Sequence, residues 1–224
     1  MTALEGVALT RADVARACDA GVPVSAKACA LDGVDLSDLD LSGWQFDRCT
    51  LTGASFNGAM LEGTGFTACR AAGATYLSAN LQEAEIKGGD FSNADLRGAT
   101  VTSARVVGCK MTGVNLSDVR AIGWELEEVL LNLAVISKVS FRKMVLKQVD
   151  FTEASLTSCD FRGAEFEACS LRDAQLVDCG FENADLRGAD LGGVSLTDAR
   201  RLKGAVISKG QAADLLAQLG LRVI

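Results

Sequence analysis

Apolar residues recur at every fifth position through most of the chain, and this period restricts the possible folds more than any other feature. Steps of five from Leu31 to Leu196 give 34 positions, and every one holds an apolar or aromatic residue. On an α-helix five residues turn about 500°, so such a stripe would drift about 140° per step. On a flat strand an odd period would alternate between the two faces. The chain must therefore turn between repeats, which predicts a solenoid.

Two further positions of each repeat are also patterned. A second, usually small residue stands two places before the apolar residue and is expected to face inward as well. Glycine stands two places after the apolar residue in 14 of the 34 repeats, which suits a turn position with positive φ. Asn, Asp, Ser or Glu occupy this position in other repeats, so glycine is favoured there but not required.

A longer period is visible in the cysteines and tryptophans. Trp44 and Trp124 share the small inward position and lie eighty residues apart. Seven of the eight cysteines also occupy this position, and within two groups they are spaced by multiples of twenty: Cys29, Cys49, Cys69, Cys109 and Cys169, and then Cys159 and Cys179. Four repeats per turn would stack each group in a column, so the spacing predicts a square coil of twenty residues. Buried thiols of this kind are small core residues rather than a tetrahedral metal site.

The repeats "ADLRG", "ADLGG", "ASFNG" and "CDFRG" resemble those of the pentapeptide-repeat family. The resemblance implies an all-β solenoid, a right-handed quadrilateral β-helix, with 8.5 coils and a length of roughly 40 Å at the usual strand spacing. We expect an N-terminal cap with a short helix at 1–28, the repeat solenoid at 29–199, and a C-terminal helix and tail at 200–224.

Both ends of the chain carry helix signals. Thr10 is a candidate N-cap, with Asp13 three residues later and Gly21 as a stop signal. This helix would cover the open edge of the first coil. Near the other end, Ser208 and Gln211 form a candidate capping box and Gly220 ends the second helix.

The C-terminal helix carries an apolar stripe, and the tail at 221–224 is expected to form a short strand. Topoisomerase-protecting members of the family end in a similar element that joins two rods. A plain cap is the alternative, but the apolar side chains exceed what one coil can cover, so we favour a homodimer through Leu215, Leu216, Leu219, Leu221, Val223 and Ile224.

Composition excludes several classes of function. The chain has no histidine, which removes Ser–His–Asp and Cys–His catalytic arrangements and the usual histidine metal sites. It has no phosphate-binding or dinucleotide-binding glycine motif. A net charge of −7 argues against nucleic acid or an anionic membrane as a direct partner. Without a signal peptide or an apolar run long enough to span a membrane, we expect a cytoplasmic protein that is not an enzyme and uses no cofactor or metal.

Acidic residues gather on one predicted face of the rod, interrupted by Lys147 and Arg187. The group consists of Glu125, Glu127, Glu128, Glu165, Glu167 and Asp185. Residues 30–198 carry a net charge of −11, whereas the last 26 residues carry +4. A solvated surface that keeps the rod soluble explains this distribution, and so does a binding face for a basic partner.

The repeat pattern weakens between Trp124 and Val149. Larger residues replace the small inward one, and apolar side chains occupy three positions expected to face outward, Leu130, Leu133 and Val135. One interpretation is a locally wider or bent coil with its own packing. The other is an exposed apolar patch that binds a partner.

The resemblance suggests two functions. Family members that protect DNA gyrase and topoisomerase IV from quinolones are acidic dimeric rods, thought to imitate duplex DNA. Our chain resembles the loop-free mycobacterial type, because its unbroken register leaves no room for the loops of the plasmid-borne proteins. The first hypothesis is a DNA mimic that binds a type II topoisomerase and modulates quinolone resistance or inhibition. The second is a scaffold for a different protein, bound through the apolar positions above.

The segment "NADLRGA" occurs at Asn93–Ala99 and again at Asn183–Ala189. The copies are ninety residues apart, which is four and a half turns of a twenty-residue coil. They should therefore face opposite sides of the rod. We interpret the repetition as a signature of the coil and not as a duplicated site.

Overall fold

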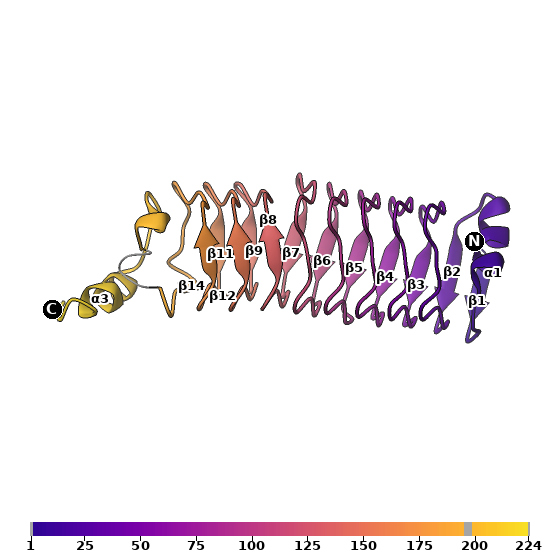
Figure 1. Ribbon diagram of the computed structural model, residues 1–224, viewed down its shortest axis with the longest axis horizontal. Helices are drawn as coiled ribbons and strands as arrows, with labels where there is room; N and C mark the ends of the chain where they lie inside the picture. The colour runs from indigo at the N-terminus through magenta and orange to yellow at the C-terminus, as the bar shows by residue number, and fades with distance from the viewer. Residues whose placement is uncertain (1, 195–198, 224) are drawn as a thin grey trace.

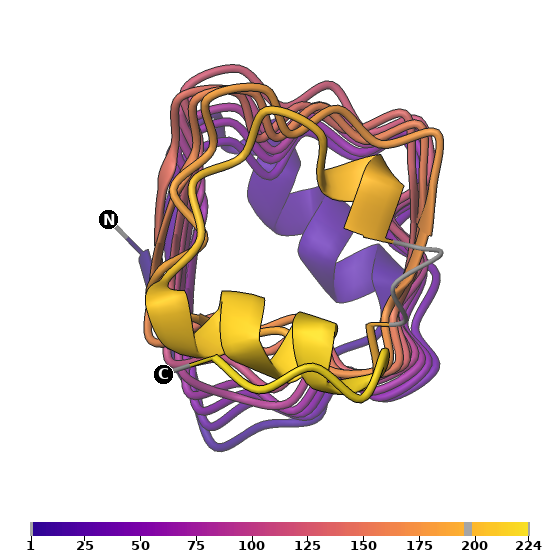
Figure 2. The same cartoon turned by 90° about the vertical axis from the view of Figure 1, so that its left-hand side faces the viewer.

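The chain winds into an elongated rod of square cross-section. The computed structural model describes residues 2–194 and 199–223. Figure 1 shows the coils stacked side by side, with a helix at each end of the rod. Figure 2, viewed along the rod from the C-terminal end, shows the coils superposed as a square. The quadrilateral β-solenoid predicted from the five-residue period is confirmed.

The four sides are named here by the buried residues at their centres, which recur every twenty residues. Face 1 is centred on Ala26, Phe46 and so on to Leu186. Face 2 runs from Leu31 to Leu191, face 3 from Leu36 to Leu176, and face 4 from Leu41 to Phe181.

Face 1 is a continuous sheet along most of the rod. Its nine strands, all parallel, follow the order β1 (Thr2–Glu5), β2 (Val24–Lys27), β3 (Gln45–Asp47), β4 (Gly65–Thr67), β5 (Glu85–Lys87), β6 (Arg105–Val107), β7 (Glu125–Glu127), β9 (Val145–Lys147) and β11 (Glu165–Glu167). From β2 onward the register advances by one coil, as in the pairing of Phe46 with Phe66.

The other faces are mostly held by single bridges. Face 3 has a second parallel sheet only in its later coils, formed by β8 (Val135–Ser137), β10 (Ser155–Thr157) and β13 (Gln175–Val177). On face 2, β12 (Cys169–Ser170) pairs with β14 (Ala189–Asp190). Earlier coils of face 3 are joined by bridges such as Ser55 to Thr75 and Thr75 to Asp95.

The predicted inward positions form one core along the rod axis. Of the 34 residues on the five-residue series, all are buried except Leu191, which is half-buried, and Leu196, which lies outside the described residues. Stacked aromatic rings strengthen two separate stretches of this core. Phe46 stacks on Phe66 at 5.1 Å between ring centroids, and Phe141 stacks on Phe161 at 4.7 Å.

The residue two places after a central residue usually turns the corner with positive φ. Within the described chain, twenty non-glycine residues adopt this left-handed conformation, among them Asn93, Asn183 and Leu133. Such backbone is strained for most side chains, and a leucine at φ 60° is the least expected of these three. Glycine is therefore favoured at the corners and not required, as predicted.

The corners are of two kinds. In one, the central carbonyl accepts a hydrogen bond from the N–H three residues later, as in Ala59 N to Phe56 O at 3.0 Å. In the other kind, the backbone stays extended, and the described residues show no bond between the central carbonyl and the N–H three residues later. Phe46 on face 1 is an example. All seven cysteines of the repeat follow extended corners.

The cysteine thiols supply a donor that the extended corners lack. Cys69 Sγ donates to the carbonyl of Phe46 at 3.3 Å, and Cys169 Sγ donates to that of Leu146 at the same distance. In each case the acceptor is the central residue of the coil below, whose carbonyl has no turn bond. Cysteine fits this position because it is small and apolar and also has a weak S–H donor. The donor explains why cysteine recurs every twenty residues, which small size alone does not.

At the N-terminal end the chain begins a coil before the helix. Strand β1 pairs with β2, and α1 (Arg11–Asp19) then closes the end of the rod. The predicted capping box is present, with Thr10 and Asp13 bonded to each other's backbone N–H. Val14 is fully buried, and the Arg11 guanidinium donates to the carbonyls of Asp35 and Ser37 at 2.8 and 2.9 Å.

At the C-terminal end the coil loses its strict period. Asp185 pairs with Val206, an offset of 21 residues, and the 3-10 helix η1 (Arg200–Leu202) places Leu202 in the core. Helix α3 (Lys209–Ala217) follows, with the predicted capping box of Ser208 and Gln211. The tail at 221–223 is not a strand, and this prediction was wrong. Leu221 N instead bonds Leu216 O at 3.3 Å, which ends the helix.

In the middle of the rod the ladder between coils is open on face 4 and at its corner with face 1. Along the rod, Val101 N bonds Arg120 O and Ser103 N bonds Ile122 O, both at 2.9 Å. One coil later the N–H groups of Ala121, Gly123, Ser140 and Val145 have no hydrogen-bond partner among the described residues. We call the opening between 119–125 and 139–145 the seam.

Large inward residues account for the seam. Trp124 and Met144 follow one another in the inward column between faces 4 and 1, where the neighbouring positions hold Ala104 and Ala164. Two bulky side chains in adjacent layers cannot both fit at the strand spacing of about 4.8 Å. Of the two interpretations of this stretch, a wider or bent coil agrees with the open ladder, and the exposed patch is not excluded by it. The position of the opening on face 4 was not predicted.

Candidate partner-binding surfaces

The predicted acidic residues do lie together. Glu125, Glu127, Glu165, Glu167 and Asp185 flank the buried centres of face 1 in three coils, and Glu128 turns the adjoining corner with φ 55°. Strands β7 and β11 hold the four face-1 glutamates on the outward positions beside Leu126 and Phe166, whereas β9 between them carries Val145 and Lys147. The two glutamate pairs are therefore two strand spacings apart, about 9.6 Å along the rod.

Cations neutralise part of this acidic face. Arg105 Nε lies 3.1 Å from Glu125 Oε2, and Arg105 Nη2 lies 3.1 Å from Glu127 Oε2. Asp185 is paired with Arg187 at 2.5 Å. Within the described chain, Glu128, Glu165 and Glu167 have no ion-pair partner. They are the carboxylates most available to an incoming partner.

Asp185 also has a structural role, which it shares with Asp95 of the other heptapeptide copy. Asp95 Oδ1 accepts the backbone N–H of Arg97 at 3.1 Å, and Asp185 Oδ1 accepts that of Arg187 at the same distance. Hydrogen bonds from the Arg187 side chain, followed by this backbone bond, lower the pKa of Asp185 to about 2. The arginine beside Asp95 lowers its pKa in the same way. Asp95 lies on face 3 and Asp185 on face 1, so the two copies face opposite sides, as expected.

The three predicted apolar positions are exposed. Leu130, Leu133 and Val135 have exposed fractions of 44%, 53% and 44%. They pass from face 2 across its corner to face 3. Ile122, at 74%, and Val145, at 43%, lie at the same level on faces 4 and 1. Sequence reasoning missed these last two, although the adjacent bulky pair Trp124 and Met144 was a usable signal.

The C-terminal residues predicted to form a joint are poorly covered. Helix α3 has no buried residue, and only Leu215 of the six predicted positions packs against the core. Leu216 is half-buried, whereas Leu219, Leu221 and Val223 are 52–58% exposed. Ile224 lies outside the described residues. Hydrogen bonds attach the helix to the last coil, because Gln211 Nε2 donates to the carbonyls of Leu186 and Ala189 at 2.8 and 2.7 Å.

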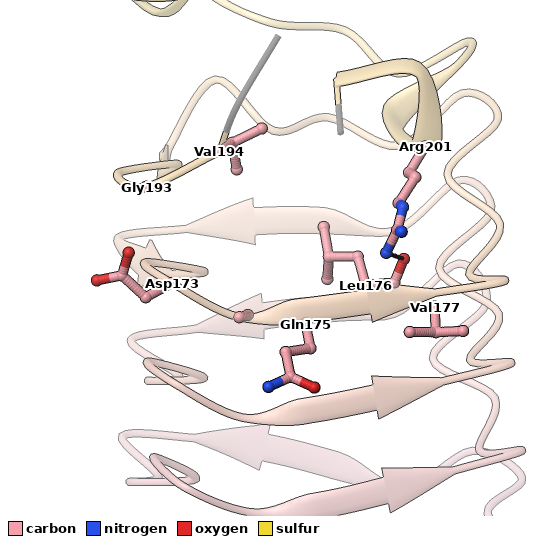
Figure 3. Close-up of a pocket in the computed structure, with 8 residues that line it drawn as sticks. Asp173, Gln175, Leu176, Val177, Gly193, Val194 and Arg201 are labelled. Atoms are coloured by element: carbon pink, nitrogen blue, oxygen red, sulfur yellow. Dashed lines mark hydrogen bonds between the residues drawn. The ribbon is translucent and has the colours of Figure 1, made fainter. Parts of the chain in front are cut away.

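A pocket of about 420 Å³ lies beside this end of the rod, between β13 and the segment that follows it. Figure 3 shows Arg201 reaching Leu176, whose carbonyl oxygen accepts from Arg201 Nη1 at 2.8 Å, with Asp173, Gln175 and Val194 around the opening. Val194 is the last described residue before 195–198. The pocket is shallow and offers backbone and mixed side-chain contacts, with no paired acid and base of the kind catalysis uses.

A second pocket, of about 380 Å³, opens at the seam. Its lining comes from β6, β7 and β9 and the corner residues next to them: Arg105, Trp124, Glu125, Leu126, Glu127, Met144, Val145 and Lys147. Trp124 is 4% exposed, and its indole N–H has no hydrogen-bond partner among the described residues.

Clusters of metal-ligating side chains and membrane-spanning helices are both absent from the part of the chain that the structure describes. Across residues 2–194 and 199–223, no cluster of three or more His, Cys, Asp or Glu side chains is arranged to hold a metal ion. All eight cysteines are free thiols. Neither helix of the described chain is long and apolar enough to span a bilayer.

Comparison with protein families agrees with the coil geometry. The family model described as "Pentapeptide repeats (8 copies)" matches residues 29–67, 78–120, 134–173, 164–200 and 174–207. The chain belongs to the pentapeptide-repeat family. No curated protein matches the sequence significantly.

Solved structures share the fold of this pentapeptide-repeat protein along its whole length. Trypsin-treated QnrB1, a plasmid-mediated fluoroquinolone resistance protein, is 21% identical with a TM-score of 0.59, and the match covers 100% of our chain and 97% of QnrB1. Full-length QnrB1 is 22% identical with a TM-score of 0.56 and 98% coverage of both chains. At this identity the likeness establishes a common fold.

Proposed function

We propose that this protein is a non-enzymatic DNA mimic that binds a type II topoisomerase, DNA gyrase or topoisomerase IV, and modulates its response to quinolones. The observation that carries the proposal is the row of carboxylates on face 1, of which Glu128, Glu165 and Glu167 have no ion-pair partner in the described chain. The fold shared with QnrB1, a plasmid-mediated fluoroquinolone resistance protein, also supports a role in the response to quinolones.

The mimicry would be one of shape and charge, without bond chemistry. Duplex DNA carries one negative charge per about 1.7 Å of axis, whereas the two glutamate pairs of β7 and β11 on face 1 are about 9.6 Å apart, because β9 between them has no carboxylate. The charge density of the rod is therefore lower than that of DNA, and ion pairs with Arg105 and Arg187 lower it further. We expect weaker competition than DNA itself provides, but a similarly steep dependence on salt.

A supercoiling assay with purified DNA gyrase, with and without a quinolone, tests the proposal. We expect micromolar protein to change the rate of supercoiling or the amount of drug-stabilised cleavage, and the change should fade as salt rises. The triple variant Glu128→Lys, Glu165→Lys and Glu167→Lys should abolish it.

A matched control keeps the same change of net charge on other parts of the rod. Asp38→Lys, Glu153→Lys and Asp178→Lys replace three exposed acidic residues at corners that do not adjoin face 1. This control should retain most of the effect. Equal loss in both triple variants would mean that total charge matters and not face 1, and no effect of the parent protein would exclude the topoisomerase proposal.

The proposal includes a homodimer through the C-terminal end. The exposed Leu219, Leu221 and Val223 support it, because α3 buries no residue of its own. We expect a dimer in sedimentation equilibrium and a monomer for Leu219→Glu with Leu221→Glu. A monomeric parent protein would leave the helix as a plain cap.

The alternative is a scaffold for a different protein, favoured by the exposed Leu130, Leu133 and Val135. Leu133→Glu should remove such a partner, and Leu133→Gly separates lost contact from lost fold, since glycine suits the left-handed corner. A partner whose binding survives both variants does not use this patch.

A further inference from the structure

The seam leaves a ladder edge in the middle of the rod. In the coils next to it, the N–H and C=O groups that one coil offers to the next are paired, as between Val101 N and Arg120 O. At the seam, the segment 119–124 keeps the carbonyls of Val119 and Trp124 and the N–H groups of Ala121 and Gly123 without the partners that other coils provide. In chain order the edge offers an acceptor, two donors and an acceptor, and these groups can bond the main chain of a polypeptide laid along it.

Apolar surface surrounds this edge. Ile122 belongs to the same segment and has 74% of its surface exposed, and Val145 at the start of β9 is 43% exposed. Val145 also lines the pocket of about 380 Å³, together with Trp124, Leu126 and Met144. It has room for one apolar side chain of a bound strand, since residues of one strand alternate between the two sides. The unpartnered indole N–H of Trp124 adds a donor at the same place.

The charged residues around the seam favour a bound segment with particular charges on either side of its apolar part. Face 1 next to the seam carries Glu125, Glu127, Glu165 and Glu167 against Arg105 and Lys147. The glutamates outnumber the cations, so a segment flanked by lysine or arginine is preferred over an acidic one. Main-chain pairing, an apolar pocket and an acidic rim together describe one kind of ligand.

We propose that the seam is a docking site for an extended, apolar polypeptide segment with basic flanks, which pairs with the edge of 119–124 and inserts one side chain beside Trp124. This goes beyond the proposed function, because it uses the corner of faces 4 and 1 and requires no topoisomerase. The occupant is a strand supplied by another protein, recognised through its main chain.

The free protein supplies the first test, by amide hydrogen exchange resolved by NMR. Ala121 and Gly123 should exchange at least about tenfold faster than Val101 and Ser103, which occupy the equivalent positions one coil earlier and are bonded. Equal protection at the two pairs would show that the seam is closed in solution, which overturns the proposal.

Binding is then measured with a defined probe. The acetylated and amidated heptapeptide Lys-Val-Thr-Val-Thr-Val-Lys has alternating apolar residues and basic ends, and its copy with N-methyl groups on alternate amides cannot donate on one edge. In a Trp44→Phe background Trp124 is the remaining tryptophan, so its fluorescence reports the pocket. We expect saturable quenching or enhancement with the first peptide, slowed exchange at Ala121 and Gly123, and at least about tenfold weaker binding of the methylated copy.

Exposed substitutions distinguish the seam from general stickiness. Ile122→Ser and Val145→Lys should each weaken peptide binding by about tenfold, because they remove apolar contact and the second also repels the basic flank. Leu130→Ser is the control, since this leucine is as exposed as Val145 but lies where the ladder is closed, and the variant should bind the peptide as the parent protein does. Three outcomes would overturn the proposal. The parent protein does not bind the peptide, it binds the methylated and unmethylated peptides equally, or the three variants lose affinity equally.

Discussion

Face 3 of the rod carries hydrogen-bonded corners in the coils before the seam and three-residue strands in the coils after it. Before the seam, Ala79 N bonds Tyr76 O at 3.1 Å, and the bond lengthens to 3.4 Å at Val119 and Leu116. After the seam this bond disappears, and Cys159 Sγ donates to the carbonyl of Ile136 at 3.5 Å. The five-residue period is the same in both regions.

The difference teaches that the period determines the coil but not the kind of corner. On face 3 alanine follows bonded corners at 59, 79 and 99 and cysteine follows extended ones at 159 and 179, whereas valine follows a bonded corner at 119 and an extended one at 139. The two regions also place their aromatic stacks differently. Phe56 stacks on Tyr76 on face 3, and Phe141, Phe161 and Phe181 stack on face 4.

The largest expected effect comes from cutting the aromatic column of the later coils. Phe161→Ala removes a fully buried ring that stacks on Phe141 and Phe181, and should reduce the free energy of unfolding by about 3–5 kcal/mol. Because each coil contacts only its neighbours and the ladder is open at the seam, amide exchange should accelerate most at 140–190.

Phe56→Ala is the reciprocal variant, in the earlier coils. It should accelerate exchange mainly at 30–100. Equal acceleration of both regions by either variant would show that they unfold as one unit, and that the seam does not separate them.

The second effect is closure of the seam. Trp124→Ala leaves Met144 beside a small residue, as in the neighbouring layers, and allows the coils to approach. We expect exchange at Ser140 and Val145 to slow by about tenfold, although the loss of the buried ring lowers overall stability. Trp44→Ala should leave these two amides unchanged. If Trp124→Ala accelerates them instead, the bulky pair does not cause the opening.

A smaller effect tests the role of the thiols. Cys49→Ala removes the Sγ donor to the carbonyl of Ala26 at 3.3 Å and should cost about 1 kcal/mol in urea unfolding. Cys18→Ala is the control, because this half-buried cysteine belongs to α1 and not to an extended corner, and its cost should be near zero. If both variants lose the same free energy of unfolding, the thiol hydrogen bonds add no stability and the repeat cysteines only fill space.

The smallest effect concerns acid stability. The pKa of Asp185 is about 2 in the folded chain and about 3.9 when unfolded, so its contribution is complete above pH 4 and is lost as pH falls through 2. Solvent limits this contribution to less than about 1 kcal/mol. Asp185→Asn should lower Tm at pH 6 but change it little at pH 2. Asp95→Asn, in the earlier coils, should behave alike, and a deficit that persists at pH 2 would mean lost packing rather than lost charge.

Sequence reasoning recovered the coil because a period of five has few physical solutions. It also located both capping boxes, since Thr10 with Asp13 and Ser208 with Gln211 are local signals. It failed at the tail, because the apolar run at 221–223 does not reveal whether a strand partner is present. The seam escaped prediction for a different reason. It depends on Trp124 and Met144 being neighbours across a turn of the coil, which is visible only when the sequence is arranged in layers.

The sequence placed the acidic residues on one face, as the structure has them. It did not predict how far nearby arginines would neutralise their charge. The pairing of Arg105 with both Glu125 and Glu127 joins residues from adjacent coils and follows from side-chain reach rather than from the repeat. Arg187 was expected to interrupt the acidic row, and it does so by binding Asp185.

The N-terminal helix has a consequence for how many rods can associate. Helix α1 lies at the end of the rod with Val14 buried beneath it and Arg11 bonded to the backbone of the first complete coil, so a second rod meets a helix there as well as coil backbone. Contacts that need two open ends build filaments, whereas a single open end permits only closed pairs. We therefore expect end-to-end association of this protein to use the C-terminal end and to stop at two rods.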